Sequence, residues 1–340
     1  MHKKIKVGII GLGVGKHHLK CFLNNKHCEV VSVCDFKVSK LNQIKLKEPK
    51  INVTTKSSDI INDKNVDLVC IASYDNFHAE QVLNCIKKNK NVFVEKPICT
   101  NQKDYFKIKK ELNKNPNICL SSNFVLRRSP QFLKLSEMIK KKKLGEIFYI
   151  SGEYNYGRLS KITEGWRSQI KNYSVTHGGA MHIIDLAINL IGIRPLKVSA
   201  LGNRISTKKT KFKYNDISTA IIKFENGLIL NVVSNFGCVM PHHHIFKVFG
   251  TKQSFIQNFN DVKIFNSRIR NNPVKKLSNI YPNHKKKIIL ENFLDTIVNR
   301  KKNTLLNSKD VLNSMAVSIA IDKSIKLSNS QMRQKSHLVA

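Results

Sequence analysis

Short apolar segments alternate with amphipathic helical patterns over the first 122 residues. The apolar segments span residues 4–10, 29–34, 51–54, 66–72, 91–94 and 117–121, with helical patterns at 39–47, 76–88 and 102–113. Apolar strands separated by helices are typical of a parallel sheet that is buried between two helical layers. The sequence therefore predicts an α/β domain with a doubly wound parallel sheet over residues 1–122.

A glycine-rich turn follows the first apolar segment and precedes a helical pattern. It reads Gly11-Leu12-Gly13-Val14-Gly15. Glycines at such a turn let the backbone approach a pyrophosphate, which then lies at the helix N-terminus. We expect a Rossmann domain in which Gly11, Gly13, Val14 and Gly15 contact a dinucleotide.

Asp35 ends the second apolar segment, 20 residues after Gly15. A carboxylate at this place accepts hydrogen bonds from the ribose hydroxyls of NAD and repels the 2′-phosphate of NADP. Lys37 and Lys40, which are close by in the sequence, work against that preference. We predict NAD as the cofactor, with NADP less favoured.

The pattern changes after residue 123. A helical segment at 130–143 precedes longer apolar strands at 146–156, 196–203, 217–225, 228–236 and 244–249, and further helices are expected at 178–191, 288–299 and 309–327. Asn226-Gly227 between two strands is a strong hairpin signal. The sequence predicts a second, α+β domain over residues 123–340 with a large, mostly antiparallel open sheet.

Two strands of this second sheet are apolar on both faces. Ala220 and Ile222 alternate with Ile221, and Leu230 alternates with Ile229. The few helices cannot cover both faces of the sheet. We expect a second copy of the chain to cover one face, in a homodimer or homotetramer.

Charge and cysteine content exclude several function classes. The 340 residues carry a net charge of +36, but lysines spread along the chain and no nucleic-acid-binding motif accompanies them. We expect no nucleic-acid partner, although this field would favour an anionic substrate. Eight cysteines form no C-x-x-C pair, so neither a zinc site nor a disulfide framework is predicted.

No segment has the length of a membrane span. The longest apolar stretch, residues 183–193, is interrupted by Asp185, and the N-terminus lacks a signal peptide. We expect a cytoplasmic protein without a membrane partner.

Several histidines outside these patterns are candidates for chemistry. His17 and His18 follow the glycine turn, where they either approach the pyrophosphate or face solvent. His242-His243-His244 resembles a metal cluster, but adjacent strand residues point to opposite faces, so at most His242 and His244 converge. We expect a solvated entry to the strand there, and no metal.

Glu95-Lys96-Pro97, directly after the fifth strand, makes a family resemblance specific. With the glycine turn, the ribose acid and His78, the chain resembles the glucose-fructose oxidoreductase, inositol dehydrogenase and rhizopine-catabolism (Gfo/Idh/MocA) family. Further motifs of that family match Arg127-Arg128-Ser129-Pro130, Leu144-Gly145-Glu146-Ile147 and Gly178-Gly179-Ala180-Met181-His182-Ile183-Ile184-Asp185.

The resemblance implies reversible oxidation of a hydroxyl on a sugar, sugar nucleotide or cyclitol by a nicotinamide cofactor. It assigns Lys96 to the reacting hydroxyl and His182 as the proton acceptor, and it lets Glu95 orient Lys96. The implied cofactor contacts add Ser73, His78, Glu95 and Lys96 to the glycine turn and Asp35. The implied substrate residues are Arg127, Tyr154, Tyr156, Trp166, Arg167 and Asp185.

Two other functions remain open on the sequence. One is a non-catalytic regulator of the same fold that senses NAD, against which the retained Lys96 and His182 argue. The other is an aldose–aldose oxidoreductase that holds its cofactor tightly.

The chain departs from the family pattern at one position. Many members carry an aspartate four residues before the histidine, where this chain has Gly178. His177 is adjacent but lies on a different helical face. Asp185 shares the face of His182, and it either tunes that histidine or bonds backbone at the domain interface.

Overall fold

A computed structural model describes residues 4–259, 261–277, 287–299 and 305–335. Two compact units make up the chain, one of residues 1–123 and 286–315, the other of residues 124–285 and 316–340. The first break lies one residue after the expected boundary at 122. Residues 286–315, which the sequence division places in the second domain, group with the first unit instead.

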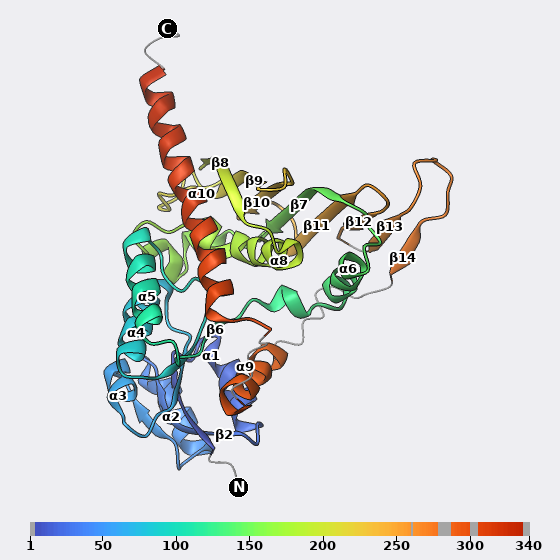
Figure 1. Ribbon diagram of the computed structural model, residues 1–340. Helices are drawn as coiled ribbons and strands as arrows, with labels where there is room; N and C mark the ends of the chain where they lie inside the picture. The colour runs from blue at the N-terminus through green and yellow to red at the C-terminus, as the bar shows by residue number, and fades with distance from the viewer. Residues whose placement is uncertain (1–3, 260, 278–286, 300–304, 336–340) are drawn as a thin grey trace. The chain divides into compact units, whose positions relative to one another are not determined.

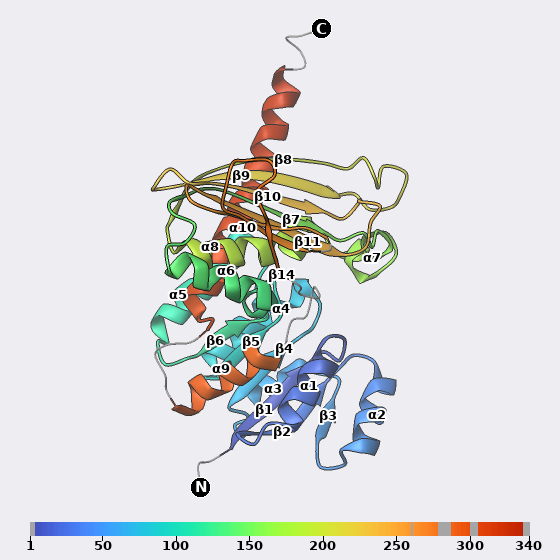
Figure 2. The same cartoon turned by 90° about the vertical axis from the view of Figure 1, so that its right-hand side faces the viewer.

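The first unit is built on a six-stranded parallel sheet in the order β3-β2-β1-β4-β5-β6 (Figure 2). The strands are β1 (Ile5–Ile10), β2 (Cys28–Cys34), β3 (Asn52–Thr54), β4 (Leu68–Ile71), β5 (Asn91–Val94) and β6 (Leu120–Ser122). Every residue of β4 is buried, as a strand between two helical layers requires. This strand order is that of a doubly wound dinucleotide-binding sheet, so the prediction is confirmed.

Helices cover both faces of this sheet. They are α1 (Gly15–Leu23), α2 (Val38–Lys47), α3 (Ser57–Asn62), α4 (Asp75–Lys87), α5 (Gln102–Lys114) and α9 (Lys287–Asn299). Helix α9 comes back from late in the sequence to lie beside α1, and the Phe293 ring packs 5.7 Å from that of Phe93 in β5. That return explains why residues after 286 belong to this unit.

The second unit contains an eight-stranded sheet in the order β14-β13-β12-β11-β7-β10-β9-β8 (Figure 1). Its strands are β7 (Ile147–Asn155), β8 (Pro195–Asn203), β9 (Ile217–Phe224), β10 (Ile229–Asn235), β11 (His243–Gly250), β12 (Ser254–Gln257), β13 (Val262–Phe265) and β14 (Lys275–Leu277). Only β7 and β10 pair in parallel; the other pairs are antiparallel. The mostly antiparallel sheet is therefore confirmed.

Helices lie against one face of this second sheet. They are α6 (Pro130–Lys140), α8 (Met181–Ile191) and α10 (Ser308–Lys335), which joins this core through Val317, Ile321 and Ile325. Helix α8 packs so closely on β7 that a Cβ at Gly152 would overlap Ile183. On β9 the side chains alternate strictly, with Ala220 and Ile222 buried and Ile221 exposed.

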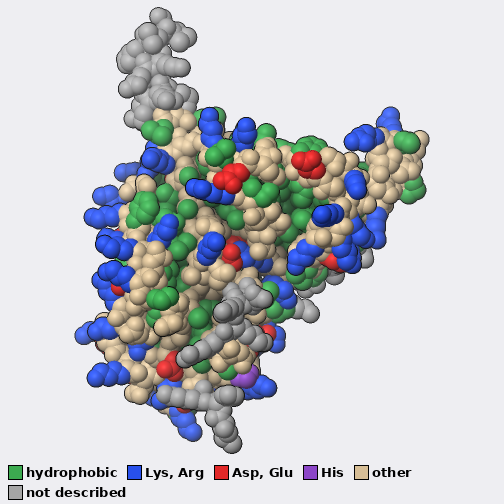
Figure 3. Space-filling model, in the orientation of Figure 1, with side chains coloured by type: hydrophobic (Ala, Val, Ile, Leu, Met, Phe, Trp, Pro, Cys, Tyr) green, Lys and Arg blue, Asp and Glu red, His purple; other side chains and the backbone are tan. Residues whose placement is uncertain are grey.

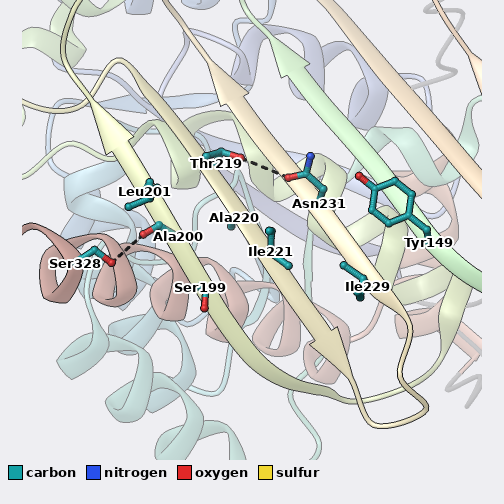
Figure 4. A pocket seen from close by; sticks show the side chains of 10 residues that line it. All are labelled: Tyr149, Ser199, Ala200, Leu201, Thr219, Ala220, Ile221, Ile229, Asn231 and Ser328. Carbon is teal, nitrogen blue, oxygen red and sulfur yellow. Dashed lines mark hydrogen bonds between the residues drawn. The ribbon is translucent and has the colours of Figure 1, made fainter.

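The other face of the sheet is open in the described chain. A hollow of about 530 Å³ lies on it, and its lining side chains come from four strands and from Ser328 of α10 (Figure 4). Ile221 is 56% and Ile229 is 40% exposed, and on the same face Thr219 Oγ1 donates a hydrogen bond to Asn231 Oδ1. Apolar side chains thus do occupy both faces, but on the open face they are mixed with polar ones.

On one face of the molecule, basic side chains are scattered rather than gathered. On the face in Figure 3, lysines and arginines are spread among hydrophobic and neutral side chains, with few acids. Among the described residues, no helix is both long and apolar enough to cross a membrane.

Candidate active site

The glycine turn between β1 and α1 is shaped by close backbone packing. Gly11 has a φ of +91°, and a Cβ there would overlap the Ala72 carbonyl oxygen at the end of β4. A Cβ at Gly13, by contrast, would meet nothing within 4 Å. Gly11 is therefore needed for the turn itself, whereas Gly13 leaves space beside the N-terminus of α1 that suits a pyrophosphate.

Asp35, at the end of β2, holds the glycine turn in place. Its carboxylate accepts hydrogen bonds from the backbone N–H of Leu12 at 2.7 Å and of Lys37 at 2.9 Å, and from the Lys40 ammonium at 3.0 Å. Burial alone would raise the pKa of Asp35, but these hydrogen bonds lower it below its ordinary value. The group is thus an anion at neutral pH, as a ribose acceptor must be.

Two aromatic side chains that the sequence analysis did not single out flank this end of the sheet. Phe36 follows β2, Tyr74 follows β4, and their rings lie 5.6 Å apart. The Phe36 ring is 60% exposed, with the Lys37 and Lys40 ammonium groups 5.9 Å from its centre. The glycine turn, Asp35 and this apolar surface together fit the pyrophosphate, ribose and adenine of NAD.

Glu95, directly after β5, is held by two side chains from distant segments. Its Oε1 contacts His18 Nε2 at 2.7 Å and accepts a hydrogen bond from Asn123 Nδ2 at 2.8 Å. Burial works to raise the pKa of Glu95, but His18, Asn123 and the nearby Lys96 charge together lower it. His18 is buried and pairs with Glu95, so its expected position facing solvent is wrong, and its approach to a pyrophosphate stays a prediction.

His78 and Ser73 also lie at the carboxyl end of the sheet. The His78 ring is fully buried and lies 2.7 Å from the Pro97 carbonyl oxygen and 3.1 Å from that of Ser73. Ser73 Oγ donates to Gln81 Oε1 at 2.7 Å. His78 therefore ties the segment after Lys96 to the end of β4; direct contact of either residue with the cofactor stays a prediction.

His182 is the second residue of helix α8 in the second unit, which follows a π-helical turn at Thr176–Ala180. Its ring is half-buried, stacks near that of Tyr154 at 6.2 Å and 22°, and meets the Phe124 ring edge-on. Burial raises the pKa of Tyr154 above its ordinary value, so this phenol keeps its proton. An imidazole, by contrast, has an ordinary pKa near neutral pH.

Gly178 and Gly179 allow aromatic rings to approach the turn before His182. A Cβ at Gly178 would overlap the Tyr173 hydroxyl, and one at Gly179 would overlap the Tyr154 ring. The space beside Gly178, where the family resemblance led us to expect an aspartate, is therefore filled by Tyr173.

Asp185 forms a buried, two-pronged ion pair with Arg127. Arg127 Nε and Nη2 each donate to one carboxylate oxygen at 2.7 Å, and both side chains are buried. Neither role expected for Asp185 includes this pair. The pair joins the 3₁₀ turn Val125–Arg128 to α8, and substrate contact by these two residues stays a prediction.

His177 faces α10 through its two ring nitrogens. Nδ1 lies 2.6 Å from Ser318 Oγ, and Nε2 lies 3.3 Å from Asp322 Oδ2. Ser174 Oγ also donates to Asp322. His177 thus anchors the π-helical turn to α10, which gives no support to a role in place of the absent aspartate.

Two of the remaining expected substrate residues, Tyr156 and Trp166, each have an arginine guanidinium over the aromatic ring. The Arg158 guanidinium lies 5.5 Å from the Tyr156 ring centre, and that of Arg167 lies 4.3 Å from the Trp166 ring centre. Tyr156 in turn stacks on Tyr154 at 5.7 Å.

The expectation for the three adjacent histidines is wrong in one respect. His243 and His244 are buried and His242 is half-buried, so this entry to β11 is not solvated. His242 and His244 do converge, with ring centres 5.1 Å apart, because the residues of a strand alternate between faces. Within the described chain, no group of three or more His, Cys, Asp or Glu side chains is placed to hold a metal ion.

Known proteins match both units. Residues 5–124 match the oxidoreductase family GFO_IDH_MocA, NAD-binding Rossmann fold, and residues 132–256 match a GFO/IDH/MocA C-terminal domain. The uncharacterized oxidoreductase YrbE of Bacillus subtilis is 26% identical over 263 residues, 75% of this chain and 74% of that protein. The myo-inositol 2-dehydrogenase of Thermotoga maritima is 25% identical over 257 residues, 73% of each.

Solved structures share the fold at lower identity. The myo-inositol 2-dehydrogenase of Lactobacillus plantarum superposes with a TM-score of 0.80 at 19% identity, covering 96% of this chain and 98% of that one. A levoglucosan dehydrogenase in complex with NADH and levoglucosan gives the same TM-score and identity, covering 95% and 98%. The predictions of the fold, of an oxidoreductase and of an NAD cofactor are confirmed, and the chain belongs to the Gfo/Idh/MocA family of NAD-binding oxidoreductases.

Proposed function

We propose that the protein is an NAD-dependent dehydrogenase that oxidises a secondary hydroxyl of a sugar, sugar nucleotide or cyclitol, with Lys96 and His182 acting on that hydroxyl. The observation that carries the proposal is the match of both units to the family together with the presence of both residues. The relatives named as inositol 2-dehydrogenases support the substrate class.

The roles of the two side chains follow from their chemistry. The Lys96 ammonium donates a hydrogen bond to the hydroxyl oxygen and stabilises the negative charge that develops there. A neutral His182 imidazole accepts the hydroxyl proton, a task that suits a group whose ordinary pKa is near 6.5. NAD, when bound, supplies the acceptor for the hydride that leaves the same carbon. Glu95, fixed by His18 and Asn123, places a carboxylate beside Lys96 and favours its charged form.

The surroundings of His182 fit a base that is neutral before reaction. Tyr154 keeps its proton, and Asp185 is engaged by Arg127. Arg158 and Arg167 lie on the aromatic side chains nearby. Positive charges near an imidazole favour its neutral form, which is the form that accepts a proton.

The test is a dehydrogenase screen with purified protein. The panel holds inositols, aldoses, uronates and nucleotide sugars, and NADH formation is followed by its absorbance. We expect turnover with at least one member, and Lys96→Met should abolish most of it. A protein that binds NADH but oxidises no member, with wild type and Lys96→Met alike, would instead favour the regulator that senses NAD.

A second measurement addresses the tightly held cofactor. An aldose–aldose oxidoreductase would carry nicotinamide through purification, so the fresh protein would show the reduced-nicotinamide absorbance once a sugar is added. A dehydrogenase that exchanges its cofactor requires added NAD for each turnover, which is the result we expect.

We further propose that the open face of the second sheet joins two copies of the chain. The exposed Ile221 and Ile229 and the shallow hollow between β7 and β8 support a sheet-to-sheet contact. The number of copies, two or four, follows from mass measurement in solution.

A further inference from the structure

The register between β7 and β11 brings two of the three adjacent histidines to one place. The strands pair antiparallel, with His244 opposite Tyr154 and His243 opposite Asn155. His242 and His244 therefore share the face of Tyr154. His243 turns to the other face, where its Nε2 lies 2.9 Å from the Asn258 carbonyl oxygen.

Three imidazoles meet around one phenol on this face. The Tyr154 ring centre lies 5.0 Å from those of both His242 and His244, and His244 lies 6.1 Å from His182. His182 and His242 are half-buried, whereas His244 and Tyr154 are buried. We call His182, His242, His244 and Tyr154 the histidine cluster.

Positive side chains extend the cluster. The Arg158 guanidinium lies 5.5 Å from the Tyr156 ring centre, and the Tyr156 ring lies 5.3 Å from that of His242. The charges of Arg158 and Arg167 both act to lower the pKa of Tyr154, against the effect of burial. Two guanidiniums thus stand close enough to act on the centre of the cluster.

Three acidic groups of the neighbouring elements are engaged elsewhere. On β7, Glu153 alternates to the other face and accepts from Asn155 Nδ2. On α8, Asp185 pairs with Arg127, and Asp216 before β9 accepts from Thr207. The charges and rings that act on Tyr154 come from imidazoles, the phenols of Tyr156 and Tyr173, and the guanidiniums of Arg158 and Arg167.

We propose that the histidine cluster, with Arg158 and Arg167, is a subsite for an anionic group on the sugar, a carboxylate or a phosphate. The proposal rests on the proposed function, because His182 is its proton acceptor. Imidazole N–H and guanidinium groups are donors that anions prefer, and charge-assisted hydrogen bonds are about twice as strong as neutral ones. An anion also offsets the mutual repulsion of His242 and His244 when both imidazoles carry a proton, whereas His182 stays neutral as the proton acceptor. We therefore expect anion binding to strengthen as the pH falls.

The test compares matched sugars on the NADH-loaded protein. Isothermal titration calorimetry measures D-glucose, D-glucuronate and D-glucose 6-phosphate at about pH 6 and about pH 8, on either side of the ordinary histidine pKa. We expect at least one anionic sugar to bind about 10-fold or more tightly than glucose, with a larger advantage at the lower pH. Comparing glucuronate with glucose 6-phosphate shows which anionic group fits.

Variants assign the preference to the cluster. His242→Gln and Arg158→Gln should each lower the affinity for anionic sugars by about 10-fold and leave the affinity for glucose unchanged. His243→Gln is the matched control, since this neighbour points to the other face, and it should keep the preference. If His242→Gln loses thermal stability, the exposed Arg158→Gln decides alone.

Two results would overturn the subsite. One is glucose binding as tightly as both anionic sugars, which would leave the histidines as partners for hydroxyl groups. The other is an equal loss in His243→Gln and His242→Gln. Turnover of neutral sugars without any preference for anionic ones would refute the subsite but support the proposed dehydrogenase activity. A preference for anionic sugars without turnover of any sugar would support the subsite but refute the dehydrogenase activity.

Discussion

The Tyr173 hydroxyl occupies the space that a side chain on Gly178 would need. Tyr173 is buried and packs edge-on against Phe212 and Phe236, so it cannot easily move aside. The absence of an aspartate at this position is therefore a change in packing as well as in charge. The turn before His182 packs against the aromatic side chain of Tyr173, where an aspartate would have placed a carboxylate.

Gly178→Ala should destabilise the protein by about 1–3 kcal/mol, because the added methyl group overpacks a filled core. Gly178→Asp should cost more, since it also buries a charge. Tyr173→Phe removes the overlapping oxygen, so the Gly178→Ala, Tyr173→Phe pair should lose less than the sum of its single variants. Chemical denaturation measures all four proteins; strict additivity would contradict the contact.

Glu95 should contribute a pH-dependent part of the stability. Its pKa in the folded chain lies below the ordinary 4.5, so its stabilisation is fully present above about pH 4.5 and is lost as the pH falls through the lower, folded value. Glu95→Gln should flatten the stability profile in that acid range. Melting temperatures measured from neutral pH downward provide the test.

The exposed Glu80→Gln is the matched control for this variant, on a helix of the same unit. This control should show the same loss of stability at acid pH as the wild type. An unchanged acid limb in Glu95→Gln would show that its pair with His18 is not maintained in solution.

The fold could be predicted where apolar periodicity is strong. The strands of the first unit, and the long strands β7, β9 and β10, lie within the ranges that the sequence indicates, except that β2 begins one residue earlier and β6 ends one residue later. The segments missed were short or exposed. Helix α3 has six residues and β14 has three, none of the latter buried, so hydrophobic patterning gives them no signal.

The site could be predicted only where its residues are neighbours in the sequence. The glycine turn and Asp35 follow their strands directly. The His18–Glu95 pair spans 77 residues and the His177–Ser318 contact spans 141, so tertiary packing alone brings them together. The convergence of His242 and His244 could be predicted from the alternation of side chains along a strand. Their burial could not, because it depends on the register of β11 with β7.

Asp35 should determine the choice of nicotinamide cofactor. We propose that its carboxylate binds the ribose hydroxyls, and it also accepts a hydrogen bond from the Leu12 N–H. Asp35→Ser should lower the affinity for NAD by about 10–100-fold, the effect of losing a hydrogen bond to a charged group. It should also reduce the preference of the protein for NAD over NADP. Titration of both reduced cofactors measures this. Lys40→Met is the control that keeps the carboxylate, and wild-type NADP binding equal to NAD would contradict the assignment.

The open sheet face should mediate self-association. Ile221→Glu or Ile229→Glu places a charge on the exposed apolar part of that face and should shift the protein towards a monomer. Light scattering at micromolar concentration measures the mass. Leu46→Glu is the control, because Leu46 is 85% exposed on α2 of the other unit and its replacement should change nothing. A monomeric wild type would refute the interface.

Lys96 and His182 should behave as one hydroxyl-activating unit. Lys96→Met keeps the apolar stem but removes the ammonium, and His182→Asn keeps a polar group that exchanges no proton near neutral pH. Each change should lower the turnover number by about 10²–10⁴-fold, the range for losing positioned acid–base catalysis. The double variant should be little worse than the poorer single one, since groups that act together are non-additive.

Cofactor affinity should separate catalysis from folding in these variants. NADH binding should change little, because the glycine turn and Asp35 are untouched, and Lys103→Met, an exposed lysine of the same unit, should retain full turnover. Steady-state kinetics on a confirmed substrate and NADH titration give both readouts. Near-wild-type turnover by His182→Asn would move the proton acceptor to another group, and Tyr156 would be tested next, because Tyr154 holds its proton too firmly to serve.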